Sequence, residues 1–110
     1  MVLDIASDYI AMGEDLEEKQ ELLNGVASAW NIACLEKIER DFAIKRYMKQ
    51  FSKLNPTHTE KELDDVEENL KLLIKQKDEL YPEVRIQIAG AYIEEKGGKD
   101  HVYVMSVREE

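Results

Sequence analysis

The spacing of hydrophobic residues changes at Pro82, and this change limits the fold more than any other feature of the chain. Before Pro82, apolar residues recur every three or four positions, which is the period of a helix with one buried face. After Pro82, Val84, Ile86 and Ile88 alternate with polar residues, as in a half-buried strand. The sequence therefore predicts an α+β fold with its helices before its strands.

Four helices are predicted before Pro82, over residues of about 3–12, 16–35, 36–54 and 60–80, the first of them short. Asp15 and Glu18 form a capping-box pattern at the start of the second helix, and Trp30 lies on its apolar stripe. Asn55-Pro56 ends the third helix, because a residue before proline disfavours the helical conformation. No Gly or Pro lies at residues 34–37, so the second and third helices are either continuous or broken there.

The end of the chain is predicted to form two strands, over about 83–94 and 101–107. Gly97-Gly98 between them is typical of a tight hairpin turn, and Gly90 indicates a bulge in the first strand. We find no repeat or Pro/Gly-rich linker that would divide the chain. The expected architecture is one domain over residues 1–110, with four helices followed by a C-terminal two-stranded antiparallel hairpin.

Composition is that of a small globular domain. Apolar residues make up 44% of the 110 residues, which is enough to build a core. Cys34 is the only cysteine, so no internal disulfide can form, and we expect its thiol to be a small buried hydrophobe. The first residues lack the basic segment of a signal peptide, and no apolar run is long enough to span a membrane. The sequence therefore predicts a soluble, cytoplasmic protein.

Charge is distributed unevenly along the chain. The formal net charge is −9, yet residues 37–56 hold six bases against two acids. These bases are Lys37, Arg40, Lys45, Arg46, Lys49 and Lys53. They form a possible partner surface for nucleic acid or an acidic protein, although we favour charge complementarity with the acidic helices of the same fold. The acidity of the whole chain makes nucleic acid the less favoured partner.

No catalytic, cofactor-binding or metal-binding residue is predicted, and no cofactor is expected. Acids cluster at the starts of the second and fourth helices, where the helix dipole favours negative charge. Dimetal sites in helical bundles use Glu-x-x-His pairs, and neither His58 nor His101 has a Glu three residues before it.

Several short phrases resemble those of a loosely defined group of short bacterial proteins. They are Ala29-Trp-Asn31, Leu54-Asn-Pro56, Leu73-Ile-Lys-Gln-Lys77 and Leu80-Tyr-Pro82. In that group a tryptophan helix precedes an Asn-Pro break, a Lys-rich helix and a β-hairpin. The resemblance implies a bacterial, cytoplasmic origin and carries no activity with it.

The leading functional hypothesis is a small self-associating protein-interaction or adaptor module without catalytic activity. One alternative is a regulatory nucleic-acid-associated protein that uses the basic helix, and another is an enzyme whose site is assembled across a dimer. We expect a homodimer, because both faces of the hairpin are apolar: Val102 and Val104 lie on one face, and Tyr103, Met105 and Val107 on the other.

Overall fold

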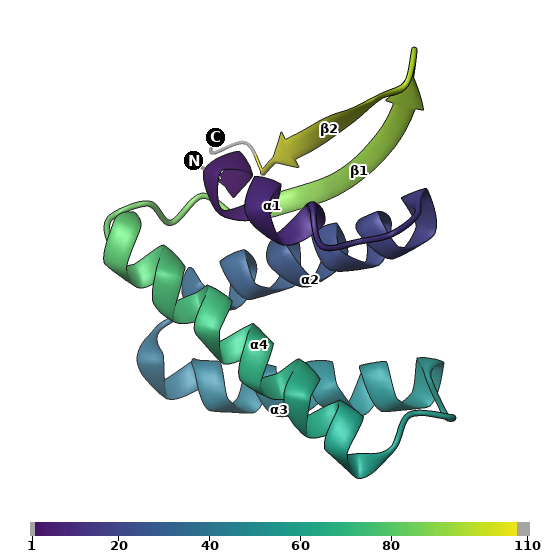
Figure 1. Cartoon of the computed structure of the whole chain (residues 1–110). Coiled ribbons are helices and arrows are strands. Elements are labelled where there is room, and N and C mark those ends of the chain that lie inside the picture. The colour runs from purple at the N-terminus through teal and green to yellow at the C-terminus, as the bar shows by residue number, and fades with distance from the viewer. Residues whose placement is uncertain (1, 108–110) are drawn as a thin grey trace.

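The computed structural model describes residues 2–107 and confirms the α+β architecture. Four helices, α1 (Val2–Ile10), α2 (Leu16–Ala33), α3 (Lys37–Leu54) and α4 (Glu60–Leu80), precede the strands β1 (Ile88–Lys96) and β2 (Lys99–Ser106). The two strands form an antiparallel sheet. In Figure 1 the hairpin and α1 lie on one side of α2 and α3 lies on the other, while α4 crosses the end of α2.

The second helix is the centre of the fold, because α1, α4 and β1 all pack against it. Its buried residues are Leu23, Val26, Ala29, Trp30, Ile32 and Ala33. Ala29 and Ala33 lie one turn apart and allow neighbouring elements to approach, while Trp30 fills the space beside them. By contrast, α3 buries Ile44 alone, so it is held to the rest of the molecule by a smaller apolar surface.

Side-chain caps mark the starts of two helices, and the cap at Asp15 was predicted from the sequence. Asp15 accepts a hydrogen bond from the backbone N–H of Glu18 at 2.8 Å, and the Glu18 carboxylate accepts one from Glu14 N–H at 2.8 Å. At α4, Thr59 and Glu62 form a complete capping box. These bonds satisfy N–H groups that have no partner within the helix.

Two boundaries are decided by the structure. Residues 34–36 are not helical, so α2 and α3 are separate helices. The prediction that the first strand begins at residue 83 was wrong, since β1 begins at Ile88. Ile88 pairs with Ser106, the last residue of β2, and residues 83–86 therefore lie beyond the ladder. Their carbonyl groups bond helix side chains instead: Lys77 donates to Val84 O, and Trp30 donates to Ile86 O.

The tight turn at Gly97-Gly98 is confirmed, and the two strands extend further toward it than predicted. Gly97 and Gly98 have φ values of 61° and 77°, so both occupy the left-handed region that favours glycine. The ladder consequently continues to the pair Lys96 and Lys99, and the strands meet the turn directly rather than ending at residues 94 and 101. The predicted bulge is confirmed by a register shift between Ile88 and Gly90.

Trp30 anchors the core, as its place on the apolar stripe predicts. Its side chain is 4% exposed, and its indole N–H donates to Ile86 O at 2.9 Å. The ring contacts Tyr81 with a centroid distance of 5.9 Å. Trp30 therefore joins α2 to the chain that follows α4, through both packing and a hydrogen bond.

Lys77 is the one buried charged or polar residue of the described chain, with 2% of its surface exposed. Its Nζ donates to Val84 O and lies 5.4 Å from the centroid of the Trp30 ring. A buried amine requires such partners, because an unpaired polar group in the interior costs several kcal/mol, about 2–7. Lys77 thus fixes the segment before β1 to α4.

Replacing Trp30 with alanine is expected to lower the free energy of unfolding by about 3–5 kcal/mol, because it removes a buried ring and the indole hydrogen bond to Ile86 O. Urea denaturation followed by circular dichroism measures this loss. Leu72→Ala, at an exposed position of α4, is the control and should cost less than about 1 kcal/mol. Equal losses in the two variants would show that Trp30 is not an anchor.

Candidate functional site

The two edges of the hairpin have different surroundings. Along β1, Asn31 of α2 bonds both backbone groups of Ile88: its Oδ1 accepts from Ile88 N–H at 2.6 Å, and its Nδ2 donates to Ile88 O at 2.9 Å. Gln20 does the same further along, accepting from Ile93 N–H at 2.9 Å and donating to Ala91 O at 3.2 Å. A side-chain carboxamide carries the same donor and acceptor as a peptide group, so α2 replaces a neighbouring strand at this edge.

The opposite edge, along β2, has no neighbouring strand in the described chain. Ala91 and Ile93 direct backbone groups toward α2, and their partners across the ladder are Val104 and Val102. Residues directly opposite in an antiparallel pair have the same orientation toward or away from each other. The backbone groups of Val102 and Val104 therefore point outward, along the open edge of β2.

The hairpin has one packed face and one face that is more exposed. Val102 and Val104 pack against the core, together with Ile93. On the other face Tyr92 and Tyr103 stack with a centroid distance of 4.8 Å and an interplanar angle of 16°. Met105, on the same face as Tyr103, is 55% exposed. The expectation of an apolar residue set on each face is met, and only the set with Val102 and Val104 packs against the core.

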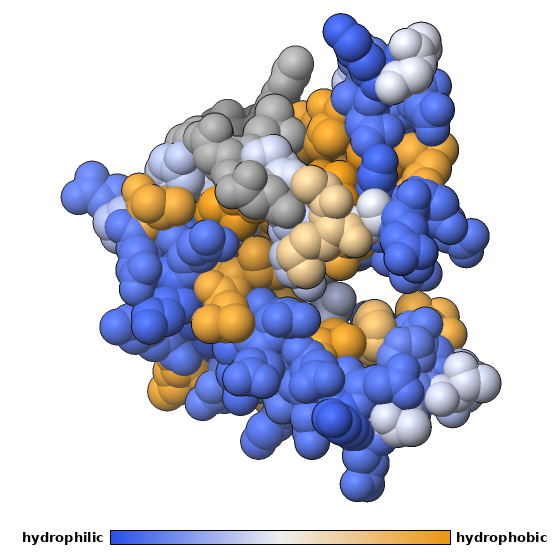
Figure 2. Space-filling view, in the orientation of Figure 1, coloured by the Kyte–Doolittle hydropathy of each residue, from blue (hydrophilic) through white to orange (hydrophobic). Residues whose placement is uncertain are grey.

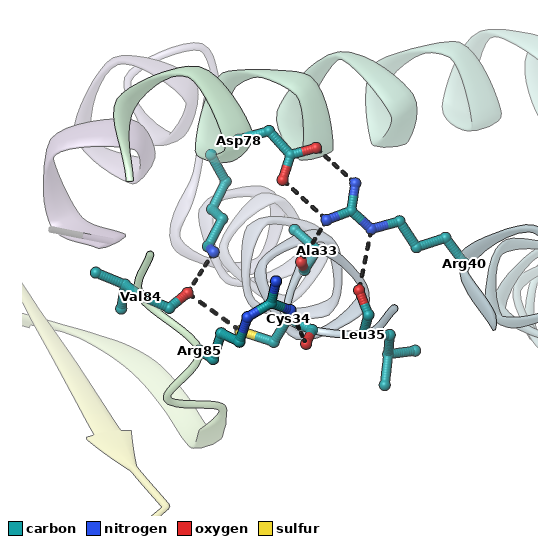
Figure 3. Close-up of polar contacts among 8 residues, drawn as sticks. Ala33, Cys34, Leu35, Arg40, Asp78, Val84 and Arg85 are labelled. Carbon is teal, nitrogen blue, oxygen red and sulfur yellow. Dashed lines mark hydrogen bonds and ion pairs between the residues drawn. The ribbon is translucent and has the colours of Figure 1, made fainter. Parts of the chain in front are cut away.

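Arg40, one of the six predicted surface bases, is engaged inside the fold. Its guanidinium forms two bonds to the Asp78 carboxylate on α4, at 2.5 and 2.9 Å. It also donates to Ala33 O at 2.7 Å and to Leu35 O at 3.3 Å, at the end of α2 (Figure 3). One side chain thus joins the junction of α2 and α3 to α4, which is a structural role.

The other five predicted bases remain at the surface. Lys37, Lys45, Arg46, Lys49 and Lys53 are exposed, and within residues 2–107 none of them forms an ion pair. Charge complementarity within the fold, which we favoured from the sequence, therefore accounts for Arg40 alone.

Two apolar side chains share the exposed surface of α3 with these bases. Ile38 is 86% exposed and Phe42 is 65% exposed, with the Arg46 guanidinium 5.0 Å from the Phe42 centroid. The aromatic residues of α3 are thus divided between its outer and inner sides. Tyr47 and Phe51 are half-buried on the inner side of α3, where they line a hollow between α2 and α3 (Figure 2).

Burial shifts the pKa of three titratable side chains, one thiol and two phenols. Burial raises the pKa of the Cys34 thiol, and the nearby charges of Lys77, Arg85 and Arg40 oppose that rise only in part, so the weakly nucleophilic thiol is the favoured form. Burial also raises the pKa of Tyr9 and of Tyr47. Among the residues that the structure describes, no three His, Cys, Asp or Glu side chains are grouped to hold a metal ion.

Comparisons with family models, with curated proteins and with solved structures gave no significant match to this chain. In the described part of the chain, no helix has the length and apolar character needed to cross a membrane.

The sequence analysis did not identify Gln20 and Asn31 as residues that position the hairpin. Their signal was their spacing: they lie eleven residues apart on the helix, or about three turns, and so point to the same side. Two amides on one side of a helix can satisfy a sheet edge, but the sequence does not show which edge.

Removing the Asn31 carboxamide should destabilise the fold, because it leaves the N–H and C=O of Ile88 without partners. We expect Asn31→Ala to lower the free energy of unfolding by about 1–3 kcal/mol. Asn69→Ala, which removes an exposed amide of α4, is the matched control and should change it by less than about 0.5 kcal/mol.

A second variant tests the donor and the acceptor separately. In Asn31→Asp the carboxylate still accepts from Ile88 N–H but cannot donate to Ile88 O, whereas the protonated acid can do both. The fold therefore raises the pKa of the introduced carboxyl, and the stability gained by protonation is present below the unfolded pKa and lost as pH rises through the folded pKa. The difference in free energy of unfolding between Asn31→Asp and the wild type should therefore become smaller from pH 7 to about pH 4. A difference that does not change with pH would show that Asn31 does not bond both backbone groups of Ile88.

Proposed function

We propose that this protein is a small self-associating protein-interaction module whose copies pair through the open edge of β2. The observation that carries the proposal is the difference between the two hairpin edges. The β1 edge is satisfied by Gln20 and Asn31, while the β2 edge directs the backbone groups of Val102 and Val104 outward. Such an edge is a template for another strand.

The sequence of β2 is compatible with pairing to itself. In an antiparallel pair with Tyr103 on the twofold axis, Val102 of each copy lies opposite Val104 of the other. Asp100 then lies opposite Ser106, and His101 opposite Met105, so no like charges face each other. Two hairpins joined in this way form a four-stranded sheet, which is more stable than a two-stranded one. Twofold pairing is also the commonest form of self-association.

The exposed face of the hairpin supports the same arrangement. Tyr92, Tyr103 and Met105 form a partly exposed apolar strip on each copy. Pairing through β2 places the two strips side by side and shields Tyr103 of each copy. It leaves α3 free, so the exposed bases of each copy stay accessible to a further partner.

Nucleic-acid binding by α3 is the second candidate, and it rests on the five exposed bases of that helix. The net charge of −9 opposes it, because phosphates are repelled by the rest of the surface. An electrophoretic shift with RNA or DNA at low salt, lost in Lys45→Glu and Lys49→Glu, would favour this function over the interaction module.

The mass in solution tests the proposed pairing. Light scattering at tens of micromolar protein should give the mass of a dimer. Tyr103→Lys should give a monomer with unchanged circular dichroism, because it opposes two ammonium groups across the axis on an exposed face. Val104→Lys should dissociate or unfold the protein, since Val104 also packs on the core, whereas Lys49→Glu should leave the mass unchanged. A monomeric wild type would overturn the proposal.

A disulfide tests the register of the pair. In a Cys34→Ser background, Tyr103→Cys should form a covalent dimer under mild oxidation, because residues opposite each other in a non-hydrogen-bonded pair lie within disulfide reach. Met105→Cys, which would face His101 of the other copy, should cross-link much more slowly. Equal rates would argue against a register centred on Tyr103.

A further inference from the structure

A groove runs along α2 beside α3, and two adjoining hollows form it. The end of α1 and the helix α4 also line the first hollow. Their volumes are about 380 Å³ and about 350 Å³, and they share Glu21, Tyr47 and Phe51 as lining residues. Along α2 the lining extends from Glu18 to Ser28, which corresponds to about 15 Å of helix. Figure 2 shows this hollow with hydrophobic residues on both sides. It is long enough to hold about three turns of another helix.

Aromatic rings line both hollows of the groove, alongside polar residues such as Asn24 and Gln50 in the second. Tyr47 and Phe51 stack with a centroid distance of 6.1 Å, and the His58 ring meets Phe51 edge-on at 5.5 Å. Large apolar side chains lie at its margins, where Met12 is 69% exposed and Leu54 is 81% exposed. Two hollows along one groove suit two anchoring side chains three or four residues apart, which is the pattern of helix-in-groove recognition.

The charge of the groove indicates the charge of its occupant. Of the described residues that line the two hollows, the acids are Glu18 and Glu21, and none is Lys or Arg. The exposed Lys45 and Lys49 of α3 do not line them. Within residues 2–107, the buried Nδ1 of His58 at the first hollow has no hydrogen-bond partner, so it can bond a polar group brought by a ligand.

We infer that this groove binds a basic amphipathic helix of a partner protein. Apolar side chains of that helix occupy the two hollows, and its Lys or Arg side chains lie against Glu18 and Glu21. The walls of the groove can adjust to this occupant, because α3 buries only Ile44 and is held at its first turn by Arg40. The inference adds a partner class to the interaction module and does not depend on pairing through β2.

Fluorescence anisotropy with a labelled synthetic peptide tests the inference. The probe is an 18-residue helix with Leu at positions i, i+3, i+7 and i+10 and Lys or Arg elsewhere, and its control carries Glu at every basic position. The full chain should bind the basic peptide saturably and should not bind the acidic one. Glu21→Lys should weaken binding about tenfold or more, because it sets like charges together at the groove. Glu68→Lys makes the same charge change at an exposed position of α4 that does not line the groove, and it should keep wild-type affinity.

Each contrary result identifies another occupant or none. Absence of saturable binding overturns the inference, and so does equal weakening by Glu21→Lys and Glu68→Lys, which would show general attraction to an acidic protein. If benzyltrimethylammonium competes with the peptide at equal concentration, the groove takes a small cation instead of a helix. If Glu21→Lys changes the mass in light scattering while Tyr103→Lys does not, a second copy of the chain occupies the groove.

Discussion

The peptide groups along β1 constrain the rest of the structure, because a sheet edge packed against a helix loses its water and must find other partners. Asn31 and Gln20 supply these partners from α2, and each carboxamide bonds both a donor and an acceptor of the strand. This arrangement fixes the strand along the helix and the face that it buries. It also leaves the outward backbone groups of Val102 and Val104, along the open edge of β2, free to pair with another strand.

The C-terminal end of the same helix is also fixed to its neighbours α3 and α4. Arg40 bonds the carbonyl groups of Ala33 and Leu35 and the carboxylate of Asp78, so the junction of α2 and α3 is fixed against α4. Beyond this junction little apolar surface draws α3 toward α2, since Ile44 is its only buried residue. The two helices are therefore joined at one end, and partly exposed aromatic rings line the groove beside them.

Charge is separated in a way that suits a protein with several contact surfaces. The exposed bases of α3 lie on a different side from the groove, whose lining acids are Glu18 and Glu21. The hairpin lies on the opposite side of α2 from α3 (Figure 1). The proposed pairing through β2 and the proposed helix site therefore use separate parts of the molecule, and both can be occupied in one assembly.

Much of the local structure was predictable from the sequence. The change of period at Pro82, the caps at Asp15 and Thr59, the Asn55-Pro56 break and the Gly97-Gly98 turn are short-range signals, and each acts through the backbone of its own neighbourhood. The apolar stripe around Trp30 likewise predicted a buried ring. These features predicted the α+β architecture. The observed strand boundaries differ from the predicted ones, because each strand extends only as far as it pairs with the other.

The tertiary structure alone decided which polar groups act inside the fold and which stay outside. Arg40 belongs to the same basic run as Lys49, and only the approach of Asp78 on α4 separates their roles. Lys77 falls on an apolar stripe, and its burial depends on Val84 O and the Trp30 ring. Gln20 and Asn31 became substitutes for a strand only because β1 lies beside them. A polar side chain is stable in the interior when its partner is in place, and partners distant along the chain are set by three-dimensional packing rather than by local sequence.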